Sequence, residues 1–456
     1  MLTSWRIKNF KAWQDSGSIK LAPLTVIFGE NSAGKSSLGQ LLLALKQTAG
    51  AGTKQQSLDF GDAQSLIDLG SFAQNLHQGQ LAEPLVFELQ WRVPSGFTLT
   101  GIAQQDAVLL DQLRLQVSVL ADQTLQPRVQ SICYTAYQQG QELFDVRYDS
   151  ADASKLQVQI KQPEMHSYSI TVADAVSPKQ FYQLPVGNGL DVQFIHALAQ
   201  QTHKVFADFQ SLAALRAAPQ RCYSWSGEIP AGVGRTGQSA VAAILAATAE
   251  QRMLQFSAKQ PELPFAQGIA YWLQQMGVAT ECAVRSVPDS SNTYQLLLKS
   301  HADACEVNLA DLGFGVSQLL PVIVQAFYAQ PNSTVWLEQP EIHLHSQVQA
   351  GLADMLIAAI QAKEGDQARN VQIIVESHSE HFLNRLQRRI AEGVISHHDV
   401  AVYFCSLDGK QAKIEALTVD TYGEIANWPD HLFGDEMTDI AARALAAVQR
   451  KRQHNN

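Results

Sequence analysis

Residues 29–37, with the sequence GENSAGKSS, carry the chemistry that is easiest to assign. They fit the phosphate-binding pattern G-x-x-x-x-G-K-[ST] without a mismatch. Backbone N–H groups at a helix start bind phosphate oxygens, and the helix dipole favours their negative charge. In this pattern Lys35 reaches the β- and γ-phosphates, and Ser36 supplies a hydroxyl to Mg²⁺. We therefore predict a site for ATP and Mg²⁺, formed by Gly29, Asn31, Ser32, Ala33, Gly34, Lys35, Ser36 and Ser37.

A second group of polar residues follows an apolar run in the sequence VWLEQPE, residues 335–341. Ligands of open α/β sheets bind outside the carboxyl ends of the strands. Glu338 is the predicted carboxylate on the metal side, and Gln339 or Glu341 is placed to orient the attacking water. An acidic strand end can also be no more than a helix cap. Because a phosphate loop stands earlier in the same chain, we favour the metal role.

Two further motifs belong to the same prediction. His378 follows the apolar run 371–375, where an imidazole can contact a γ-phosphate or a catalytic water. Gly315 and Ser317 lie in a glycine-rich turn that opens a helix, which makes a second anion-binding helix start. One phosphate loop does not need another. The economical interpretation is that Gly315 and Ser317 cap the γ-phosphate held by a second copy of the chain.

Short apolar strands and helical patterns must position these residues. Residues 24–28 read as a buried strand before the loop, and strand, turn and helix alternate again after residue 294. We predict an α/β fold with a mainly parallel, cassette-type ATPase sheet covered by helices. Period-two alternation predicts an antiparallel β elaboration, and a mostly helical insertion follows it. The predicted boundaries are 1–82 for the first part of the ATPase domain, 83–175 for the β region, 176–300 for the helical insertion and 301–456 for the second part.

The middle of the chain contributes one ambiguous motif. Arg216, Arg221 and Arg235 stand beside glycine- and proline-containing turns. They are placed either to contact phosphates or a partner's acidic surface, or to form local ion pairs on a solvated loop. The sequence does not decide between these interpretations.

Composition restricts the environment and the partners. Lys and Arg number 33 against 43 Asp and Glu, for a formal charge of −10, which disfavours an extensive DNA-wrapping surface. The five cysteines are scattered without a C-x-x-C pair, as expected in a reduced compartment. We expect a cytoplasmic protein without a signal peptide, a membrane span or a membrane partner.

The order of these motifs resembles the ATP-binding cassette class of ATPases, in the branch that contains SMC, RecF and OLD-type (overcoming lysogenisation defect) proteins. Residues 6–11 resemble that branch's opening strand, and residues 338–345 resemble the OLD-like ATPases of bacterial antiphage systems. The resemblance makes Glu338 the Walker B acid, Ser317 the signature serine that acts on a partner copy, and His378 the switch histidine. It implies dimers or larger homo-oligomers closed by shared ATP.

One departure from the cassette pattern concerns the water. The class usually carries glutamate directly after the Walker B acid, whereas this chain carries Gln339. An amide can orient water but cannot accept its proton. Either Glu341 or another group compensates, or hydrolysis is slow and ATP acts mainly as a dimer clamp. We favour slow hydrolysis.

Three functions remain in competition. The first is an ATP-controlled sensor or scaffold that regulates a separately encoded effector, with a nuclease as the favoured partner, in antiphage defence. The second is a RecF- or SMC-like DNA-maintenance ATPase, for which the basic clusters 385–389 and 450–452 are the DNA-binding candidates. The third, an OLD-type nuclease in the same chain, ranks last because no Asp-x-Asp pair follows His378.

Overall fold

The computed structural model describes most of the chain, and two small segments near its carboxyl end. The basic cluster 450–452 lies outside this description, as does the expected boundary between residues 175 and 176. The described residues are 1–51, 56–94, 97–99, 108–162, 165–172, 178–185, 192–257, 260–288, 290–301, 303–429, 442–443 and 445–446.

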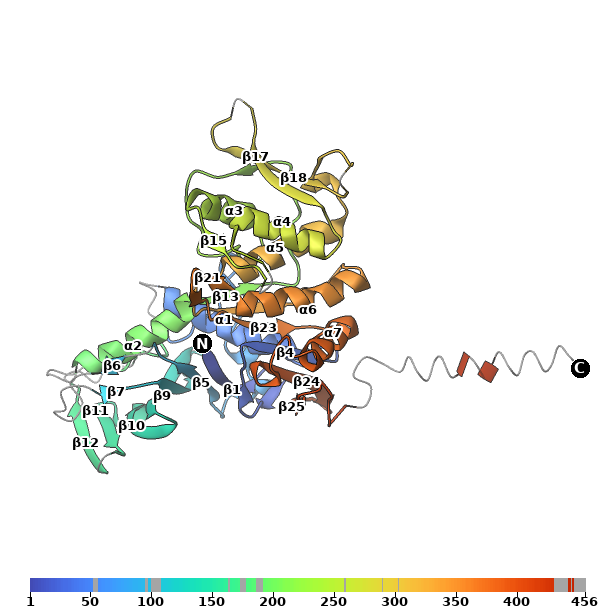
Figure 1. Ribbon diagram of the computed structural model, residues 1–456. Helices are drawn as coiled ribbons and strands as arrows, with labels where there is room; N and C mark the ends of the chain where they lie inside the picture. Colours follow the sequence, from blue (N-terminus) through green and yellow to red (C-terminus); the bar gives the residue numbers. More distant parts are fainter. Residues whose placement is uncertain are drawn as a thin grey trace, which may run out of the picture.

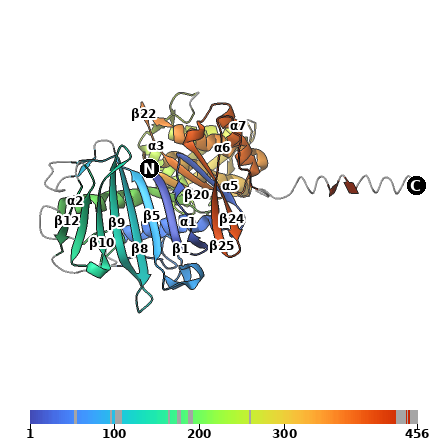
Figure 2. The same ribbon diagram turned by 90° about the horizontal axis from the view of Figure 1, so that it is seen from below.

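A nine-stranded antiparallel sheet forms one side of the molecule (Figure 2). Its order is β12-β11-β10-β9-β8-β5-β1-β2, with β3 paired to β1. Leu113, Leu115 and Val117 of β8 are buried while Gln116 is exposed, as period-two alternation predicts. The sheet begins earlier in the chain than expected, because the three strands before the phosphate loop belong to it. Its strands are β1 (Leu2–Phe10), β2 (Trp13–Asp15), β3 (Ile19–Lys20), β5 (Leu85–Arg92), β8 (Gln112–Ala121), β9 (Pro127–Gln138), β10 (Gln141–Asp149), β11 (Lys155–Ile160) and β12 (His166–Thr171).

A six-stranded sheet of order β13-β20-β23-β4-β24-β25 carries the predicted site. All neighbouring pairs are parallel except β24 with β25. The α/β class with a mainly parallel, helix-covered sheet and a separate antiparallel region is confirmed. Its strands are β13 (Phe209–Leu212), β20 (Thr334–Glu338), β23 (Gln372–Glu376), β4 (Leu24–Gly29), β24 (Val400–Asp408) and β25 (Gln411–Leu417).

Each face of the parallel sheet belongs to a different core. Trp336 and Ile374 pack with α1 (Lys35–Gly50), α2 (Val192–Ala207) and the antiparallel sheet. Val335 and Leu337 point to the other face, because successive side chains of a strand alternate. Helices from the second half of the chain cover that face (Figure 1). They are α3 (Ala240–Ala249), α4 (Phe265–Gln275), α5 (Phe314–Tyr328), α6 (Ser346–Gln361) and α7 (Glu380–Ala391).

The stretch from 176 to 300, expected to be mostly helical, is mixed. It contains α2, α3 and α4, but it also supplies β13, the edge strand of the parallel sheet. Strand β13 is only four residues long, with the sequence FQSL, which is too short a run to separate from a loop by periodicity. The smaller strands of the molecule are β6 (Thr98–Leu99), β7 (Val108–Leu109), β14 (Tyr223–Ser224), β15 (Met253–Leu254), β16 (Leu263–Pro264), β17 (Glu281–Ser286), β18 (Thr293–Lys299), β19 (Val307–Asn308), β21 (Lys363–Glu364) and β22 (Gln367–Ala368).

The described helices α1, α2 and α6 each span 16 residues. Among the described residues, no helix combines the length and apolar character needed to cross a bilayer.

Candidate nucleotide site at the carboxyl edge of the parallel sheet

The phosphate loop has the strand–loop–helix context that its sequence predicts. It leaves the fully buried strand β4 and enters α1 at Lys35. Gly29 has φ 146°, and a Cβ there would lie 2.1 Å from the carbonyl oxygen of Cys405 in β24. Gly34 has φ 87° and precedes the helix. Both positions require glycine, because a side chain would meet backbone or force a strained conformation.

Lys35 is held inside the loop. Its Nζ donates hydrogen bonds to the carbonyl oxygens of Gly29 at 2.9 Å and Glu30 at 2.6 Å. Burial lowers the pKa of Lys35, and nearby acidic groups oppose that shift. A phosphate bound above the loop would offer this amine a charged partner in place of two neutral carbonyls.

A cavity of about 230 Å³ opens over the start of α1. It brings together loop residues and two residues from other strand ends, Gln339 and His378. Gly29, Ala33, Gly315, Ser317, Glu338 and Glu341 lie outside its described lining. The residues around it are Lys11, Ala12, Asn31, Ser32, Gly34, Lys35, Ser36, Ser37, Gln40, Gln339 and His378.

Glu338, the predicted metal-side carboxylate, faces arginines. Its Oε1 lies 3.7 Å from an Nη of Arg235 in an ion pair. Arg216 donates from Nη2 to the main-chain oxygens of Glu338 and Gln339, each at 3.2 Å. Burial raises the pKa of Glu338, and the two arginines act against that rise.

The arginine-containing loop separates into a buried and an exposed part. Arg216 is only 7% exposed, and its Nε and Nη1 have no hydrogen-bond partner among the described residues. Burial lowers the pKa of Arg216 to about 10. Arg221, in contrast, is an exposed residue that pairs with Asp311 at 2.6 Å. Arg221 thus forms the local ion pair of the second interpretation, whereas Arg216 binds the main chain of the strand end, a contact that neither interpretation anticipated.

Gln339 lines the cavity in a strained conformation. Its φ is 42°, in the left-handed region that non-glycine residues seldom adopt. The Gln339 N–H donates to the carbonyl oxygen of Glu376 at 2.9 Å, and Arg216 donates to the carbonyl oxygen of Gln339. Such strain persists only where surrounding contacts enforce it, and it is common at functional sites.

Glu341 and His378 contact each other rather than sharing the cavity. The Glu341 carboxylate accepts a hydrogen bond from the His378 N–H at 2.6 Å. Burial raises the pKa of Glu341. Burial, followed by the charge of Lys35, lowers the pKa of His378 and favours the neutral imidazole. Glu341 thus holds the main chain of His378, while His378 lines the cavity.

Glu376 is the site residue that sequence reasoning missed. It ends β23, is 1% exposed, and accepts a hydrogen bond from Ser36 Oγ to its Oε2 at 2.7 Å. Trp336 Nε1 donates to its Oε1, also at 2.7 Å. Gly39 of α1 leaves room for this indole, since a Cβ there would lie 2.5 Å from the ring. Burial raises the pKa of Glu376 to about 7.

A signal for Glu376 was present in the sequence. Like Glu338, it is an acidic residue at the end of an apolar run, and it stands two positions before His378. The sequence prediction gave His378 a role in the site and gave Glu376 none. Only the strand order shows that β23 lies directly next to β4.

Gly315 and Ser317 form a separate helix start. Gly313 precedes α5, and Ser317 is buried with its Oγ donating to the carbonyl of Phe314 at 2.7 Å. The Phe314 ring is 52% exposed and packs edge-on against His343, with 5.0 Å between centroids. Within one copy this turn is not part of the cavity above Lys35.

The donors near Ser36 suit Mg²⁺ only together with a phosphate. A serine hydroxyl and a carboxylate are hard oxygen ligands of the kind Mg²⁺ prefers. Across the described residues, no group of three or more His, Cys, Asp or Glu side chains could hold a metal unaided. Ser36 and the strand-end carboxylates therefore fit a magnesium ion that takes further ligands from ATP and water.

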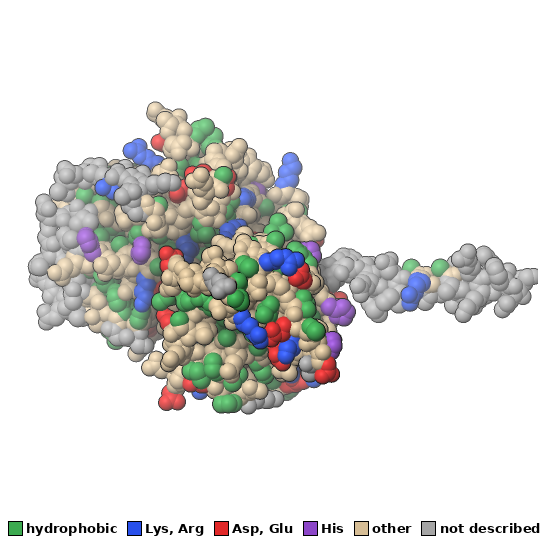
Figure 3. Space-filling model, turned by 90° about the horizontal axis from the view of Figure 1, so that it is seen from above, with side chains coloured by type: hydrophobic (Ala, Val, Ile, Leu, Met, Phe, Trp, Pro, Cys, Tyr) green, Lys and Arg blue, Asp and Glu red, His purple; other side chains and the backbone are tan. Residues whose placement is uncertain are grey.

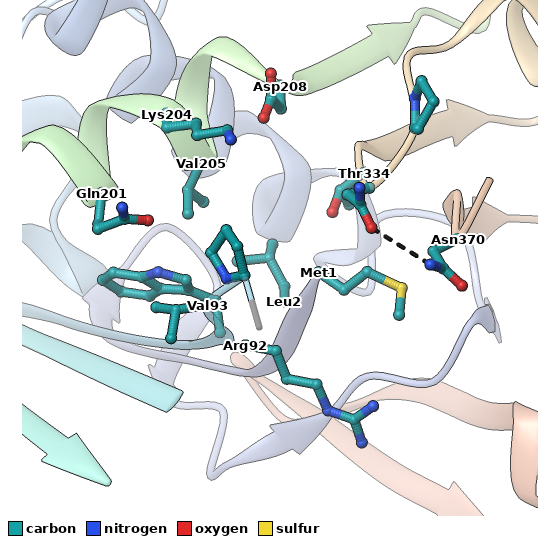
Figure 4. Close-up of a pocket in the computed structure, with 14 residues that line it drawn as sticks. Met1, Leu2, Arg92, Val93, Gln201, Lys204, Val205, Asp208, Thr334 and Asn370 are labelled. Atoms are coloured by element: carbon teal, nitrogen blue, oxygen red, sulfur yellow. Dashed lines mark hydrogen bonds between the residues drawn. The ribbon is translucent and has the colours of Figure 1, made fainter. Parts of the chain in front are cut away.

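A larger cavity, of about 480 Å³, lies at the opposite edge of the sheet (Figure 4). Lys204 and Asp208 lie on one side of it, and Met1 and Asn370 on the other. Size alone would favour this cavity as the binding site. The predicted phosphate and metal groups instead gather around the smaller one, so chemistry selects the smaller cavity.

Comparisons with known proteins agree with the chemistry over part of the chain. Residues 265–383 match the family model described as AAA ATPase domain. Residues 395–442 match a family described only as a protein of unknown function. The first match makes this stretch similar to an ATPase domain. No curated protein sequence matches the chain.

Solved structures of SMC heads overlap most of the chain at low similarity. The SMC head domain from Thermotoga maritima is 10% identical, with a TM-score of 0.36, and the match covers 92% of this chain and 99% of that one. An Smc head from Pyrococcus furiosus, bound to the C-terminal domain of ScpA, is also 10% identical, with a TM-score of 0.42, 91% of this chain and 96% of that one covered. TM-scores below 0.5 do not establish a common fold, so the site rests on its own geometry.

Proposed function

We propose that the chain is an ATPase that binds Mg·ATP in the cavity above Lys35 and hydrolyses it slowly. The observation that carries this proposal is the convergence of Lys35, Ser36, Gln339 and His378 on one cavity at a helix start. The loop and the helix dipole supply positive potential for the phosphates. Gln339 orients water without accepting its proton, which limits the rate.

The second part of the proposal is that ATP joins two copies of the chain. Gly315 and Ser317 form an anion-binding helix start that the cavity of their own copy does not use. The exposed Phe314 ring beside them offers apolar contact area at the same surface. A partner copy that presents this turn to the γ-phosphate would bury both features.

The third part concerns what the ATP-bound state controls. The resemblance of residues 338–345 to OLD-like antiphage ATPases supports a sensor or scaffold that regulates a separately encoded effector, with a nuclease as the favoured class. Affinity purification from the native host tests this part. A stoichiometric second protein supports it, and DNA as the sole co-purifying partner contradicts it.

The alternative, a RecF- or SMC-like ATPase that binds DNA directly, loses one supporting feature. The arginines of α7 are paired, because Arg385 and Arg389 contact Asp354 and Arg388 contacts Glu392. On the face shown in Figure 3, basic side chains are scattered among acidic ones. A DNA-binding surface would instead gather unpaired positive charge.

Lys35→Ala tests the ATP site. We expect ATP affinity to fall by roughly 100-fold, because the amine that would face the β- and γ-phosphates is lost. Calorimetric titration with ATP measures the affinity, and light scattering measures ATP-dependent assembly, which should disappear as well. Lys155→Ala, which removes an exposed lysine of the antiparallel sheet, is the matched control. Assembly that still responds to ATP in the Lys35→Ala protein would exclude the shared-ATP dimer.

A further inference from the structure

Two glutamates end neighbouring parallel strands in register. Glu338 of β20 pairs with Glu376 of β23, and Glu376 in turn pairs with Ile27 of β4. Neighbouring strands lie about 4.8 Å apart, so Glu376 stands one strand from the phosphate-loop strand and Glu338 stands two. The strand order therefore places the Glu376 carboxylate closer to the phosphate loop than the Glu338 carboxylate.

The hydrogen bonds and ion pairs of the two carboxylates also place Glu376, and not Glu338, next to the phosphate loop. Glu376 accepts the Ser36 hydroxyl and the Trp336 indole N–H, each at 2.7 Å. Glu338 instead pairs with Arg235, and Arg216 binds its main chain. The charge of Glu338 is thus compensated by a direct ion pair. Glu376 has two neutral donors as direct partners, and the charge of Lys35 acts on it only at longer range. A buried carboxylate with these partners is stabilised further by a bound cation.

The hydrogen bond to Ser36 also has a direction that matters. Ser36 Oγ donates to Glu376 Oε2, as it must when Glu376 is ionised and has no proton to give. The hydroxyl proton therefore points to Glu376, and the oxygen lone pairs remain free for a metal ion. Such an outer partner fixes the orientation of a metal ligand.

We infer that Glu376, acting through Ser36, is the carboxylate that forms the magnesium site, and that Glu338 instead anchors the arginine-containing loop. The inference rests on the proposed binding of Mg·ATP. It assigns Glu376 as a positioning residue whose hydrogen bond holds the serine ligand. Trp336 keeps the second carboxylate oxygen in place, and Gly39 admits the indole that does so.

The test compares Glu376→Gln with Glu338→Gln by calorimetric titration of ATP, once with excess Mg²⁺ and once with EDTA. We expect Glu376→Gln to lower the Mg²⁺-dependent gain in ATP affinity by roughly 10- to 100-fold, the usual effect of losing such a partner. Its affinity in EDTA should stay within about twofold of the wild type. Glu338→Gln should keep the Mg²⁺-dependent gain. Loss of the gain in Glu338→Gln with retention in Glu376→Gln would overturn the assignment.

A double-mutant cycle checks that Glu376 acts through Ser36. Ser36→Ala should reduce the Mg²⁺-dependent gain, and adding Glu376→Gln should reduce it little further, because residues that act through one contact are not additive. Additive losses would contradict the inference. Electron paramagnetic resonance of Mn²⁺ with ATP reports metal binding separately from turnover.

The same titrations distinguish failure of the proposed ATPase function from failure of the Glu376 assignment. A wild-type chain that binds no ATP with or without Mg²⁺ removes both the ATPase and the metal assignment. A wild type with a normal Mg²⁺ gain, shared by Glu376→Gln, removes the assignment alone. If Glu376→Gln does not fold, Trp336→Phe frees Oε1 of Glu376, the oxygen opposite the one that Ser36 contacts, and so loosens the carboxylate. An unchanged Mg²⁺-dependent gain in that variant would also count against the inference.

Discussion

The two ends of strand β23 hold buried polar side chains that serve different purposes. At the amino end, both functional atoms of the Gln372 amide are fully used. Its Oε1 accepts from the Leu2 N–H and the Thr334 hydroxyl, and its Nε2 donates to the carbonyls of Leu2 and Ala22. At the carboxyl end, Glu376 keeps a buried carboxylate between two neutral donors, Ser36 and Trp336.

The difference lies in what each end contributes to the fold. Gln372 joins β1, β20 and the turn before β4 at the edge away from the nucleotide cavity. Its four hydrogen bonds offset the cost of its burial. Glu376 stands at the edge where ligands of such sheets bind, and its burial raises its pKa to about 7. A buried polar group with all its partners stabilises the fold, whereas one that needs a cation to balance its charge points to function.

The largest effect we expect comes from removing the four hydrogen bonds of Gln372 at the amino end of β23. Gln372→Leu nearly preserves the volume of the side chain. It removes the hydrogen bonds to the main chain of Leu2, the carbonyl of Ala22 and the hydroxyl of Thr334. Four hydrogen bonds at roughly 1 kcal/mol each predict a loss of about 4 kcal/mol in the free energy of unfolding. Urea denaturation followed by circular dichroism measures it.

Gln116→Leu on the exposed face of β8 is the matched control, with an expected change within about 0.5 kcal/mol. The comparison between the two ends also predicts that any Gln372→Leu protein that still folds keeps its Mg²⁺-dependent gain in ATP affinity. A selective loss of that gain with normal stability would reverse the roles of the two ends.

Local sequence was sufficient to predict the strands and turns at the carboxyl edge of the parallel sheet. It was insufficient to predict which of them are in contact. The phosphate loop, the acidic strand end and the histidine strand end were all predicted, because each combines a short apolar run with a polar turn. The order of the strands was not, and it is the order that places Glu376, rather than Glu338, beside Ser36. Parallel neighbours are far apart in sequence, so no local pattern reveals them.

The predictions for the arginine-containing loop and for the boundaries of the two sheets were limited for the same reason, because they depend on contacts between distant residues. Arg216 and Arg221 are five residues apart in similar surroundings, yet one is buried against β20 and the other pairs on the surface. Strand β13 is four residues long and reads as a loop. Strand β1 lies in the stretch 1–82 that was assigned to the first part of the ATPase domain, yet it joins the nine-stranded sheet. Alternation alone does not say which of two sheets a strand joins.

A smaller effect is expected from changing the water-facing side chain at the carboxyl end. Gln339→Glu supplies the carboxylate that the cassette pattern carries, on a residue that already lines the cavity. We expect steady-state ATP turnover to rise about 10- to 100-fold, because a carboxylate can accept a proton from water. Phosphate release assays measure the rate, and Gln116→Glu controls for the added charge. An unchanged rate would transfer the base role to another group, with Glu341 next in line.

The smallest effect concerns the helix that follows the carboxyl end of β23. Arg388 of α7 is a mostly exposed residue that pairs with Glu392 at 2.7 Å, four positions along the helix. Exposed pairs of this type contribute less than about 0.5 kcal/mol, so Arg388→Ala should leave the free energy of unfolding nearly unchanged. Its effect on DNA binding, measured by fluorescence anisotropy at several salt concentrations, should match that of Lys413→Ala, which removes an exposed charge from β25. A reduction of the salt dependence by about one unit for Arg388→Ala alone would mean that α7 contacts phosphates. That outcome would favour the DNA-binding alternative and extend the functional edge of the sheet beyond the cavity.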